Sequence, residues 1–521
     1  MCGKGAVQKM KTRQTLINSS VLLIQQILSM LLAFVNRRLF AQFLSMEYLG
    51  YTTLFSEVLV WVTFVDTGFS AIMSYRVFQA VAQDDAKEIR HVLAIYQKIV
   101  NGLCLSIAGI GVGATLVLPT IIKDPPASWT LLYKIYWVQL LGVVFSYMFS
   151  SRRILFLAKQ REYYCASVDT AAKIMVQIFQ LIILWRAHSL LGYLLVASFG
   201  NLLANLLIYI WAKLKYPSQI PQRPVRLQQL LSEKDLWFDI KNAVASNIAN
   251  TIYFATDSLV ISRFCGILDV ARYGTYSVLL TQTMNLGFTK IVNGFRGSIG
   301  NLVYENITLD EQKKLFEQME LIGFFLISIL TTGYVACCQT AVELWMGQES
   351  LLPVAFLVIT VLVKYVAGVQ QIVYLYRLAF GKYDEDRNAM LLSAVLNVVL
   401  SIAGAQMYGV TGVALGTLIA NTSIAIGRAR IVVKDFLNIP TFAYVKKHAT
   451  WFGIVLLQWG TAHWICKGIS ISWPGLLGKG CVAVLISVVF NSVTLWNTRA
   501  FCLLRKRAVK ILVKGRCGQS D

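Results

Sequence analysis

Long apolar runs, each able to cross a lipid bilayer, constrain this chain more than any other feature of its sequence. A helix needs about 20 apolar residues to cross a hydrocarbon core, and in lipid only helices and closed barrels satisfy every backbone hydrogen bond. The sequence therefore predicts an all-α polytopic membrane protein with about fourteen transmembrane helices. The runs lie at roughly 16–43, 51–75, 92–118, 132–157, 165–185, 190–212, 241–262, 273–298, 318–340, 353–378, 389–407, 410–427, 448–467 and 476–497.

Composition supports a chain whose solvent is mostly lipid. Hydrophobic residues make up 56% of the sequence and charged residues only 14%, whereas about a quarter of the residues in a soluble domain are charged. The net charge of +22, from 48 Lys and Arg against 26 Asp and Glu, would suggest nucleic acid in a soluble protein. Here the basic residues fall mostly between the apolar runs, as topology signals do. We therefore exclude a nucleic-acid partner.

The placement of Lys and Arg predicts the orientation of the helices. With the N-terminus inside, most of the basic residues fall in cytoplasmic segments, as the positive-inside rule requires. Both termini are then cytoplasmic. The opposite side holds Lys123, Arg186, Arg263, Arg272, Lys467 and Lys479.

The polar interval around 213–240 divides the spans into six and eight. We predict an N-lobe over 1–215, a cytoplasmic linker over 216–240, a C-lobe over 241–435, and two further helices with a basic tail over 436–521. Two lobes related by an internal repeat are a common transporter plan. The interval is too short for a soluble catalytic or nucleotide-binding domain, which argues against an ATP-driven pump. The ten cysteines show no metal-ligand spacing, so no metal and no cofactor is expected.

Seven segments in order along the chain carry a family resemblance. Together they resemble the Wzx-type oligosaccharide flippases of the multidrug/oligosaccharidyl-lipid/polysaccharide (MOP) exporter superfamily. They are "EYLGYTTLFSEVL" at 47–59, "DTGFSAIMSYRVFQAVAQDD" at 66–85, "SSRRILFLAKQREYY" at 150–164, "ATDSLVISRFCG" at 255–266, "GSIGNLVYEN" at 297–306, "ELWMG" at 343–347 and "YGVTGVALGT" at 408–417.

This resemblance implies a fold, a substrate and a location. It implies two pseudo-symmetric six-helix lobes around a central cavity, plus two C-terminal helices. It also implies transfer of an isoprenoid-diphosphate-linked oligosaccharide from the inner to the outer leaflet of a bacterial cytoplasmic membrane. The implied partners are the lipid-linked oligosaccharide, membrane lipids and other membrane proteins of polysaccharide assembly.

Basic residues inside the spans are the candidates for substrate binding. Ionisable groups at membrane depth are costly unless they face a cavity, pair or snorkel. Arg37 and Arg38 lie at the outer end of the first span, where their guanidinium groups could clamp a diphosphate or snorkel to outer headgroups. Lys364 lies near the midplane of its span, where it could face a cavity or bind a structural partner such as a carbonyl or an acid. The remaining candidates for diphosphate or glycan binding are Lys98, Lys173 and Arg263.

Three acidic residues are candidates for coupling or gating. Glu57 and Asp66 lie nine residues apart in the second run, on opposite helix faces, so they should not share one ion site. Asp66 could bind a coupling proton or sodium ion, or support a local break at Gly68. Asp257 could pair with an arginine of the other lobe or only with a local charge. Arg152 and Arg153, near the inner end of the fourth span, are interpreted as topology anchors.

Several competing functions remain open from the sequence. A drug or cation antiporter of the same superfamily would favour an acid-lined cavity, whereas the excess charge inside these spans is basic. A peptidoglycan lipid-precursor flippase shares the helix plan and the anionic substrate. A membrane glycan polymerase or glycosyltransferase would need a larger outward loop, and a scaffold would not need charges at mid-depth. The chain is therefore interpreted as a transporter and not an enzyme. The energy source stays open between proton or sodium coupling and the membrane potential.

Overall fold

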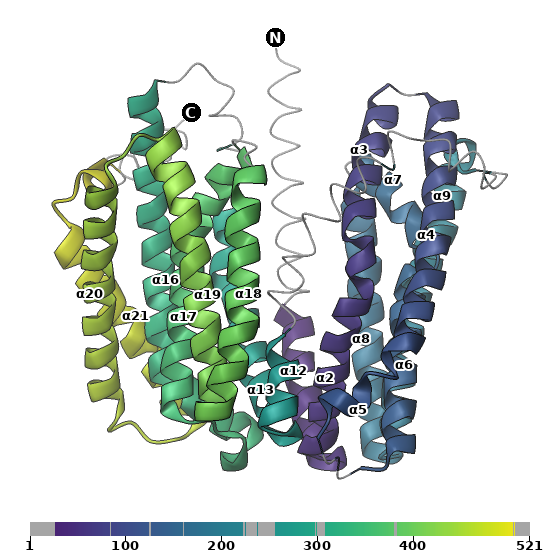
Figure 1. Ribbon diagram of the computed structural model, residues 1–521, viewed down its shortest axis with the longest axis horizontal. Coiled ribbons are helices and arrows are strands. Elements are labelled where there is room, and N and C mark those ends of the chain that lie inside the picture. Colours follow the sequence, from purple (N-terminus) through teal and green to yellow (C-terminus); the bar gives the residue numbers. More distant parts are fainter. Residues whose placement is uncertain are drawn as a thin grey trace, which may run out of the picture. The chain divides into compact units, whose positions relative to one another are not determined.

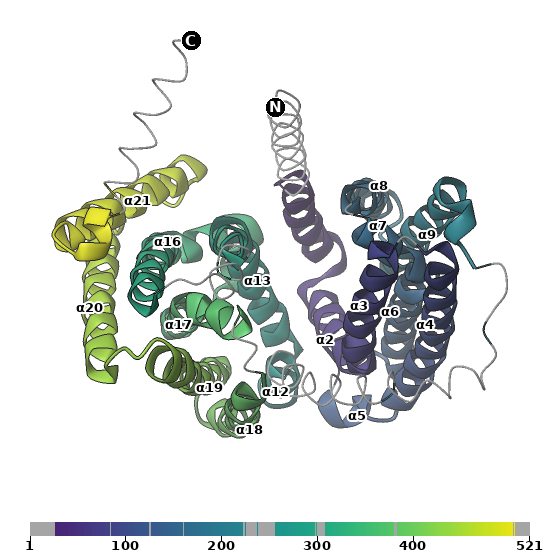
Figure 2. The same cartoon turned by 90° about the horizontal axis from the view of Figure 1, so that it is seen from above.

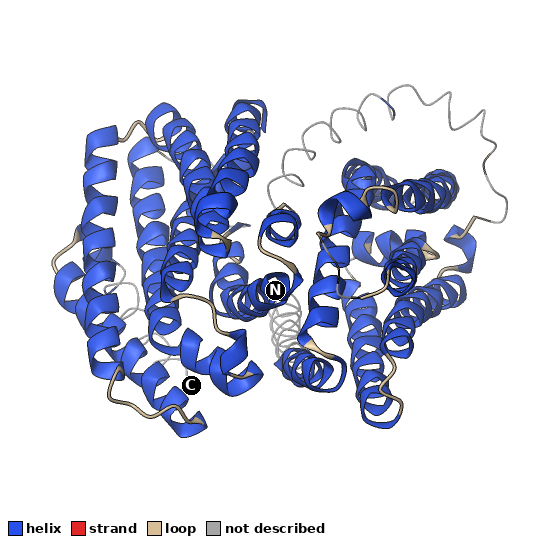
Figure 3. Cartoon of the chain, turned by 60° about the horizontal axis from the view of Figure 1, so that its bottom comes forward, coloured by secondary structure: helices blue, strands red, loops and turns tan. Residues whose placement is uncertain are grey.

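The computed structural model is built from helices. It describes residues 27–83, 85–123, 127–159, 161–221, 256–296, 308–379 and 383–503, with the single residues Pro125, Val225, Trp237, Ile299 and Arg505. Every regular element in these ranges is a helix, and the connections between them are short loops (Figure 3). The predicted all-α class is therefore confirmed.

Ten of the described helices are long and apolar enough to cross a membrane. The ten correspond to predicted runs, and the protein is a multi-pass membrane protein; the count of fourteen stays a prediction. The predicted run at 241–262 lies mostly outside the described residues. The ten spans are Ile27–Leu44, Ala86–Ala114, Trp129–Ala158, Tyr163–Arg186, Leu190–Lys215, Leu309–Met346, Val354–Ala379, Arg387–Tyr408, Val410–Phe436 and Trp473–Leu495.

The chain forms two compact units, Met1–Ala271 and Arg272–Asp521, called here the N-terminal and C-terminal units. In the N-terminal unit α6 packs on α4 and α9, and α8 packs on α9 (Figures 1 and 2). Besides the helix Ile27–Leu44, its elements are α2 (Met46–Val62), η1 (Thr63–Gly68), α3 (Phe69–Ala82), α4 (Ala86–Ala114), α5 (Leu118–Ile121), α6 (Trp129–Tyr147), η2 (Ser150–Arg152), α7 (Arg153–Ala158), α8 (Glu162–Arg186), α9 (Leu190–Lys215), η3 (Pro217–Gln219) and α12 (Asp257–Phe264).

Local sequence explains where several of these helices begin. Ser45, Asp85 and Ser189 each precede a helix, and each side chain accepts a hydrogen bond from a backbone N–H of the first turn. Such residues satisfy donors that have no partner within the helix. The 3₁₀ segment η1 separates α2 from α3, so the second predicted run is an interrupted helix and not a straight one.

The boundary between the units falls within α13 (Ile267–Met284), beyond the predicted linker at 216–240. The reason is the packing of α12 against α2 and α5. A Cβ atom at Gly50 of α2 would collide with the backbone carbonyl of Ile267, so the two backbones touch at this point. Residues 256–271, assigned to the C-lobe from the sequence, thus pack with the N-terminal unit.

The C-terminal unit centres on the long helix α16, which packs on α17, α20 and α21. A capping box formed by Thr308 and Glu311 begins α16. After α13 the elements are η4 (Asn285–Thr289), α14 (Lys290–Asn293), α16 (Leu309–Met346), η5 (Gln348–Ser350), α17 (Val354–Ala379), α18 (Tyr383–Tyr408), α19 (Val410–Ala429), η6 (Arg430–Phe436), α20 (Thr441–Cys466) and α21 (Trp473–Leu495).

Glycine sets the closest helix crossing in this unit. Gly404 of α18 and Gly412 of α19 face one another, and a Cβ atom at either position would overlap the backbone of the other. Small residues allow membrane helices to approach until their backbones touch, which increases the van der Waals contact that holds them together in lipid.

Candidate functional site

A break in a membrane-spanning helix organises the candidate site of the N-terminal unit. Helix α6 ends at Tyr147, and Phe149 then adopts a left-handed backbone conformation with φ 63° before η2 and α7 resume. A bulky residue disfavours this conformation, and such strain persists only where the surroundings support it. The Phe149 ring packs edge-on against Tyr209 of α9, with 5.4 Å between ring centroids.

A buried amide on α9 satisfies carbonyl groups near the end of α6. The Asn205 side chain is 3% exposed and donates to the carbonyl oxygens of Phe145 and Ser146, at 3.3 and 2.6 Å. Its own oxygen accepts from Arg153 Nε at 2.7 Å. In lipid each unpaired backbone group would be costly, so Asn205 supports the break directly.

Arg153 continues this network to α8. Its two terminal nitrogens donate to the two carboxylate oxygens of Asp169, each at 2.6 Å. This is the bidentate geometry in which arginine binds carboxylates most strongly. The interpretation of Arg153 as a topology anchor stays a prediction, and the structure adds that its guanidinium is bonded to Asn205 and Asp169. Arg152 is 3% exposed, with its guanidinium 5.3 Å from the Tyr209 ring.

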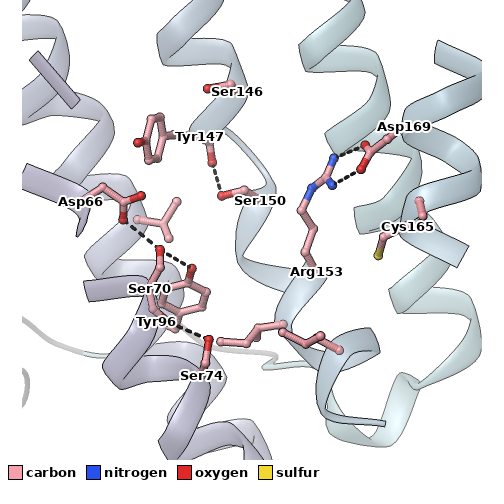
Figure 4. A pocket seen from close by; sticks show the side chains of 14 residues that line it. Asp66, Ser70, Ser74, Tyr96, Ser146, Tyr147, Ser150, Arg153, Cys165 and Asp169 are labelled. Atoms are coloured by element: carbon pink, nitrogen blue, oxygen red, sulfur yellow. Dashed lines mark hydrogen bonds and ion pairs between the residues drawn. The ribbon is translucent and has the colours of Figure 1, made fainter. Parts of the chain in front are cut away.

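A polar cavity of about 430 Å³ opens beside the break (Figure 4). Side chains from η1, α3, α4, α6, η2, α7 and α8 line it. Of the predicted site residues Asp66 alone lines the cavity, and its carboxylate accepts from Ser70 Oγ at 2.9 Å. The other polar side chains of the lining are Ser70, Ser74, Tyr96, Ser146, Tyr147, Ser150, Arg153, Cys165 and Asp169.

Most of the serine protons at this cavity are already donated to backbone carbonyls. Ser74 Oγ donates to the Ser70 carbonyl at 2.7 Å, Ser146 Oγ to Val143 at 2.6 Å, and Ser150 Oγ to Tyr147 at 2.7 Å. The hydroxyl oxygens keep their lone pairs, so they remain acceptors. Together with the Asp66 carboxylate, these serine oxygens give this part of the cavity lining more hydrogen-bond acceptors than donors.

Glu57 lies elsewhere in the N-terminal unit, where it caps α12. One carboxylate oxygen accepts from Ser258 Oγ at 2.6 Å, and the other accepts from the Ser258 backbone N–H at 3.3 Å. Ser258 is fully buried in the first turn of α12, next to Asp257. A carboxylate is favourable at a helix N-terminus because it satisfies donors there and matches the helix dipole. Glu57 and Asp66 therefore have different partners.

The predicted basic residues do not gather at the cavity. Arg37 is half-buried and donates from Nη2 to the Ala271 carbonyl at 3.3 Å, whereas the neighbouring Arg38 is exposed. The other members are distributed over four helices: Lys98 is half-buried on α4, Lys173 is exposed on α8, Arg263 is exposed on α12, and Lys364 is half-buried on α17. Lys364 Nζ donates to Thr281 Oγ1 at 3.5 Å within the C-terminal unit.

Several polar side chains buried in the C-terminal unit bond one another between helices. Glu320 of α16 is 3% exposed, forms an ion pair with Lys447 of α20 and lies 3.3 Å from Nε2 of His448 on the same helix. Further along, Gln458 of α20 donates to Asn491 of α21 at 2.7 Å, and Asn491 donates to Ser328 of α16 at 2.7 Å. These contacts fasten the two C-terminal helices to α16.

Sequence analysis missed the broken helix and the groups around it. The signal was present in "SYMFSSRR" at 146–153, a polar interruption in an otherwise apolar run. Hydroxyl residues spaced by four, such as Ser146 and Ser150, would also have indicated one polar helix face. Asp169 carried no such signal, because its role depends on a partner sixteen residues away on another helix.

Comparison with known proteins places the chain in a family. A family model for polysaccharide biosynthesis proteins matches residues 15–289, just over half of the 521 residues. The chain belongs to this family. No curated protein sequence gives a significant match.

Solved structures of transporters have the same fold as this member of the family. A structure described as lipid II flippase MurJ in an inward closed conformation matches with a TM-score of 0.67 at 15% identity, covering 92% of this chain and 99% of that one. An inward-facing multidrug resistance MATE family transporter of the MOP superfamily matches with a TM-score of 0.62 at 13% identity, covering 78% of this chain and 95% of that one. The fold implied by the sequence resemblance is thus confirmed, and the family shown is that of the polysaccharide biosynthesis proteins.

Proposed function

We propose that this protein is a flippase that moves an isoprenoid-diphosphate-linked oligosaccharide from the inner to the outer leaflet for surface polysaccharide assembly. The observation that carries the proposal is membership of the polysaccharide biosynthesis family together with a transporter fold. We place the chain in a bacterial cytoplasmic membrane with both termini inside, on the distribution of Lys and Arg. Its partners would be the lipid-linked oligosaccharide, membrane lipids and other membrane proteins of the assembly route.

The diphosphate needs cationic groups at membrane depth. Arg37 and Arg38 supply planar guanidinium groups, which match phosphate oxygens in a bidentate manner. Lys98, Lys173, Arg263 and Lys364 would supply further positive charge along the path. Outward movement of a negative charge gains about 2.3 kcal/mol per 100 mV when the inside is negative. The membrane potential could therefore drive the step, with proton or sodium coupling at Asp66 as the alternative.

Alternating access requires contacts that break and reform. The bonds from Ser258 to Glu57 tie α12 to α2 across about two hundred residues of sequence. We propose that this pair, with Asp257 beside it, acts as a gate whose opening accompanies transport. The reason is that the contact consists of hydrogen bonds from Ser258 to the Glu57 carboxylate. Such bonds can break and reform without separating an ion pair.

A second candidate is a drug or cation antiporter. One observation favours it, since the cavity beside the helix break contains the carboxylates Asp66 and Asp169 against the single guanidinium of Arg153. A peptidoglycan lipid-precursor flippase is a third candidate because the MurJ structure covers 92% of the chain.

A reconstituted flipping assay separates these candidates. The full chain is placed in liposomes, and the outward movement of a lipid-diphosphate oligosaccharide, a lipid II analogue and the organic cation tetraphenylphosphonium is measured. We expect flipping of the oligosaccharide lipid, lost in Arg37→Ala/Arg38→Ala and reduced in Lys364→Ala. The control is Lys467→Gln, which removes an exposed cation at the C-terminal end of α20. Transport of the cation alone by a folded wild type would overturn the proposal.

A further inference from the structure

The cavity beside the α6–α7 break has the size of a small-ligand site. Its volume of about 430 Å³ lies within the range of ligand pockets, roughly 300–1,000 Å³. A bare metal ion would leave most of this space unfilled. The cavity contains none of the basic residues proposed to hold the diphosphate, so its ligand is a different part of the substrate. This step rests on the proposed function.

Charge excludes the diphosphate from this cavity. The Arg153 guanidinium already donates two hydrogen bonds to the Asp169 carboxylate and one to Asn205, so its charge is balanced within the protein. The Asp66 carboxylate adds a negative charge that is bonded only to the neutral hydroxyls of Ser70 and Tyr147. A phosphate is negatively charged and offers only hydrogen-bond acceptors. The Asp66 carboxylate would repel its charge, and the lone pairs of the serine hydroxyls would face its oxygens without a proton between them.

Hydrogen-bond complementarity favours a ligand rich in donors. The protons of Ser74, Ser146 and Ser150 are donated to backbone carbonyls, so these hydroxyls offer lone pairs to the cavity. The Asp66 carboxylate has further acceptor positions beyond those that the Ser70 and Tyr147 hydroxyls occupy. Adjacent hydroxyl groups of a pyranose ring supply several donors within the reach of such a wall.

Two tyrosines complete a surface suited to a sugar ring. Tyr96 and Tyr147 both line the cavity, and Figure 4 shows them on either side of Ser70 and Asp66, from α4 and α6. Their rings present flat apolar faces with a polar tip, which is the character of groups that orient ligands in pockets. The Tyr96 hydroxyl lies 3.4 Å from Ser70 Oγ, so the tyrosine and the Asp66 partner form one connected set.

We infer that this cavity binds a neutral sugar unit of the transported lipid-linked oligosaccharide, through sugar hydroxyl donors to Asp66 and the surrounding serine oxygens. The helix break creates the space, and Asn205 with Arg153 holds the break open. The N-terminal unit would thus recognise the glycan by hydrogen bonds, while the diphosphate is held by basic residues outside this cavity.

The test compares two forms of one lipid. Proteoliposomes containing the full chain are given an isoprenoid diphosphate that carries the oligosaccharide flipped by the wild type, or the same lipid trimmed enzymatically to its bare diphosphate. The readout is the initial flipping rate of the lipid with its oligosaccharide divided by that of the bare diphosphate lipid. We expect this ratio to fall about tenfold in Asp66→Asn and about threefold in Ser74→Ala, since each removes one acceptor from the sugar.

Ser423→Ala in α19 is the matched control, because this serine also donates to a carbonyl of its own helix but lies in the other unit. An unchanged ratio in both folded variants would overturn the inference and leave the proposed function standing. If Asp66→Asn does not fold, Ser74→Ala decides. A wild type that flips neither lipid would overturn the proposed function and this inference together. Tetraphenylphosphonium transport that depends on Asp66, with an unchanged sugar ratio, would assign the cavity to a cation instead.

Discussion

The two units differ in what some of their polar side chains contact. In the N-terminal unit a broken helix leaves space, and Asp66 and several serine oxygens face a cavity of about 430 Å³. In the C-terminal unit Glu320 and Gln458 are buried and bonded directly to other side chains. A polar group that lines a cavity can exchange its partner for a ligand, whereas a polar group bonded inside a packed interface holds helices together. The comparison predicts that substitutions will affect transport in the first set and stability in the second.

The largest loss of stability is expected for Glu320→Ala. It would leave the Lys447 ammonium group and the His448 imidazole of α20 without the carboxylate that now binds both. Removing one partner of a buried ion pair typically costs about 3–5 kcal/mol. Thermal unfolding in detergent micelles measures the effect. Glu317→Ala removes a half-buried carboxylate one turn earlier on α16 and serves as the control. Equal unfolding temperatures for the two variants would show that the cluster is not a stabilising contact.

The next effect concerns the amide network of α20 and α21. Gln458→Leu leaves Asn491 without its donor, and an unsatisfied buried polar group costs about 1–3 kcal/mol. Replacing both residues, in Gln458→Leu/Asn491→Leu, removes both polar partners and is expected to restore part of the loss. A double-mutant cycle from unfolding temperatures checks this. Simple additivity of the two single losses would contradict direct coupling.

A smaller loss is expected for Arg153→Met. The side chains of Arg153 and Asp169 are 32% and 43% exposed, so water screens their pairing, and we expect about 1 kcal/mol. The substitution also removes the hydrogen bond from Arg153 to the Asn205 oxygen, which supports the helix break. We therefore expect a clear fall in the transport rate together with this small loss of stability. Arg153→Lys keeps the charge but not the bidentate fork, and it separates charge from geometry. A variant with reduced stability and unchanged transport would contradict a role of the break in transport.

The smallest change in stability is expected for Asp66→Asn. Its carboxylate faces the cavity and accepts hydrogen bonds from the hydroxyls of Ser70 and Tyr147, which an amide oxygen can also accept. We expect a change within about 0.5 kcal/mol, as for substitutions away from packed contacts. Unfolding temperature compared with that of Asp169→Asn measures it. A loss as large as that of Glu320→Ala would make Asp66 a structural residue and erase the contrast between the units.

Part of the fold could be predicted from the sequence, and particular residues show where prediction stopped. The apolar runs predicted the helices because burial in lipid imposes a length and a composition that one segment reveals alone. The run at 132–157 was predicted as one continuous helix, yet it breaks at Met148 and Phe149. The break depends on Asn205 and Tyr209 from α9, which local propensity does not contain.

The candidate site divides in the same way. Asp66 could be singled out because an acid within an apolar run is costly on its own. Arg153 could not be assigned, since a basic residue near a helix end is equally expected of a topology anchor until Asp169 is seen beside it. The basic residues were predicted from their depth within the apolar runs, which does not tell where a side chain points. Packing decides that: Lys173 is exposed, while Arg37 donates to the Ala271 carbonyl.

The sequence by itself determined that this protein is helical, spans the membrane several times and resembles the MOP exporters, because hydropathy and short motifs are local properties. Only the tertiary structure decided where the helix breaks open a cavity, which carboxylates are committed to partners and which hydroxyl oxygens remain as acceptors. Those properties depend on the contacts made by residues far apart in the chain. Hydrogen-bond partners, unlike hydropathy, cannot be assigned until the helices have packed.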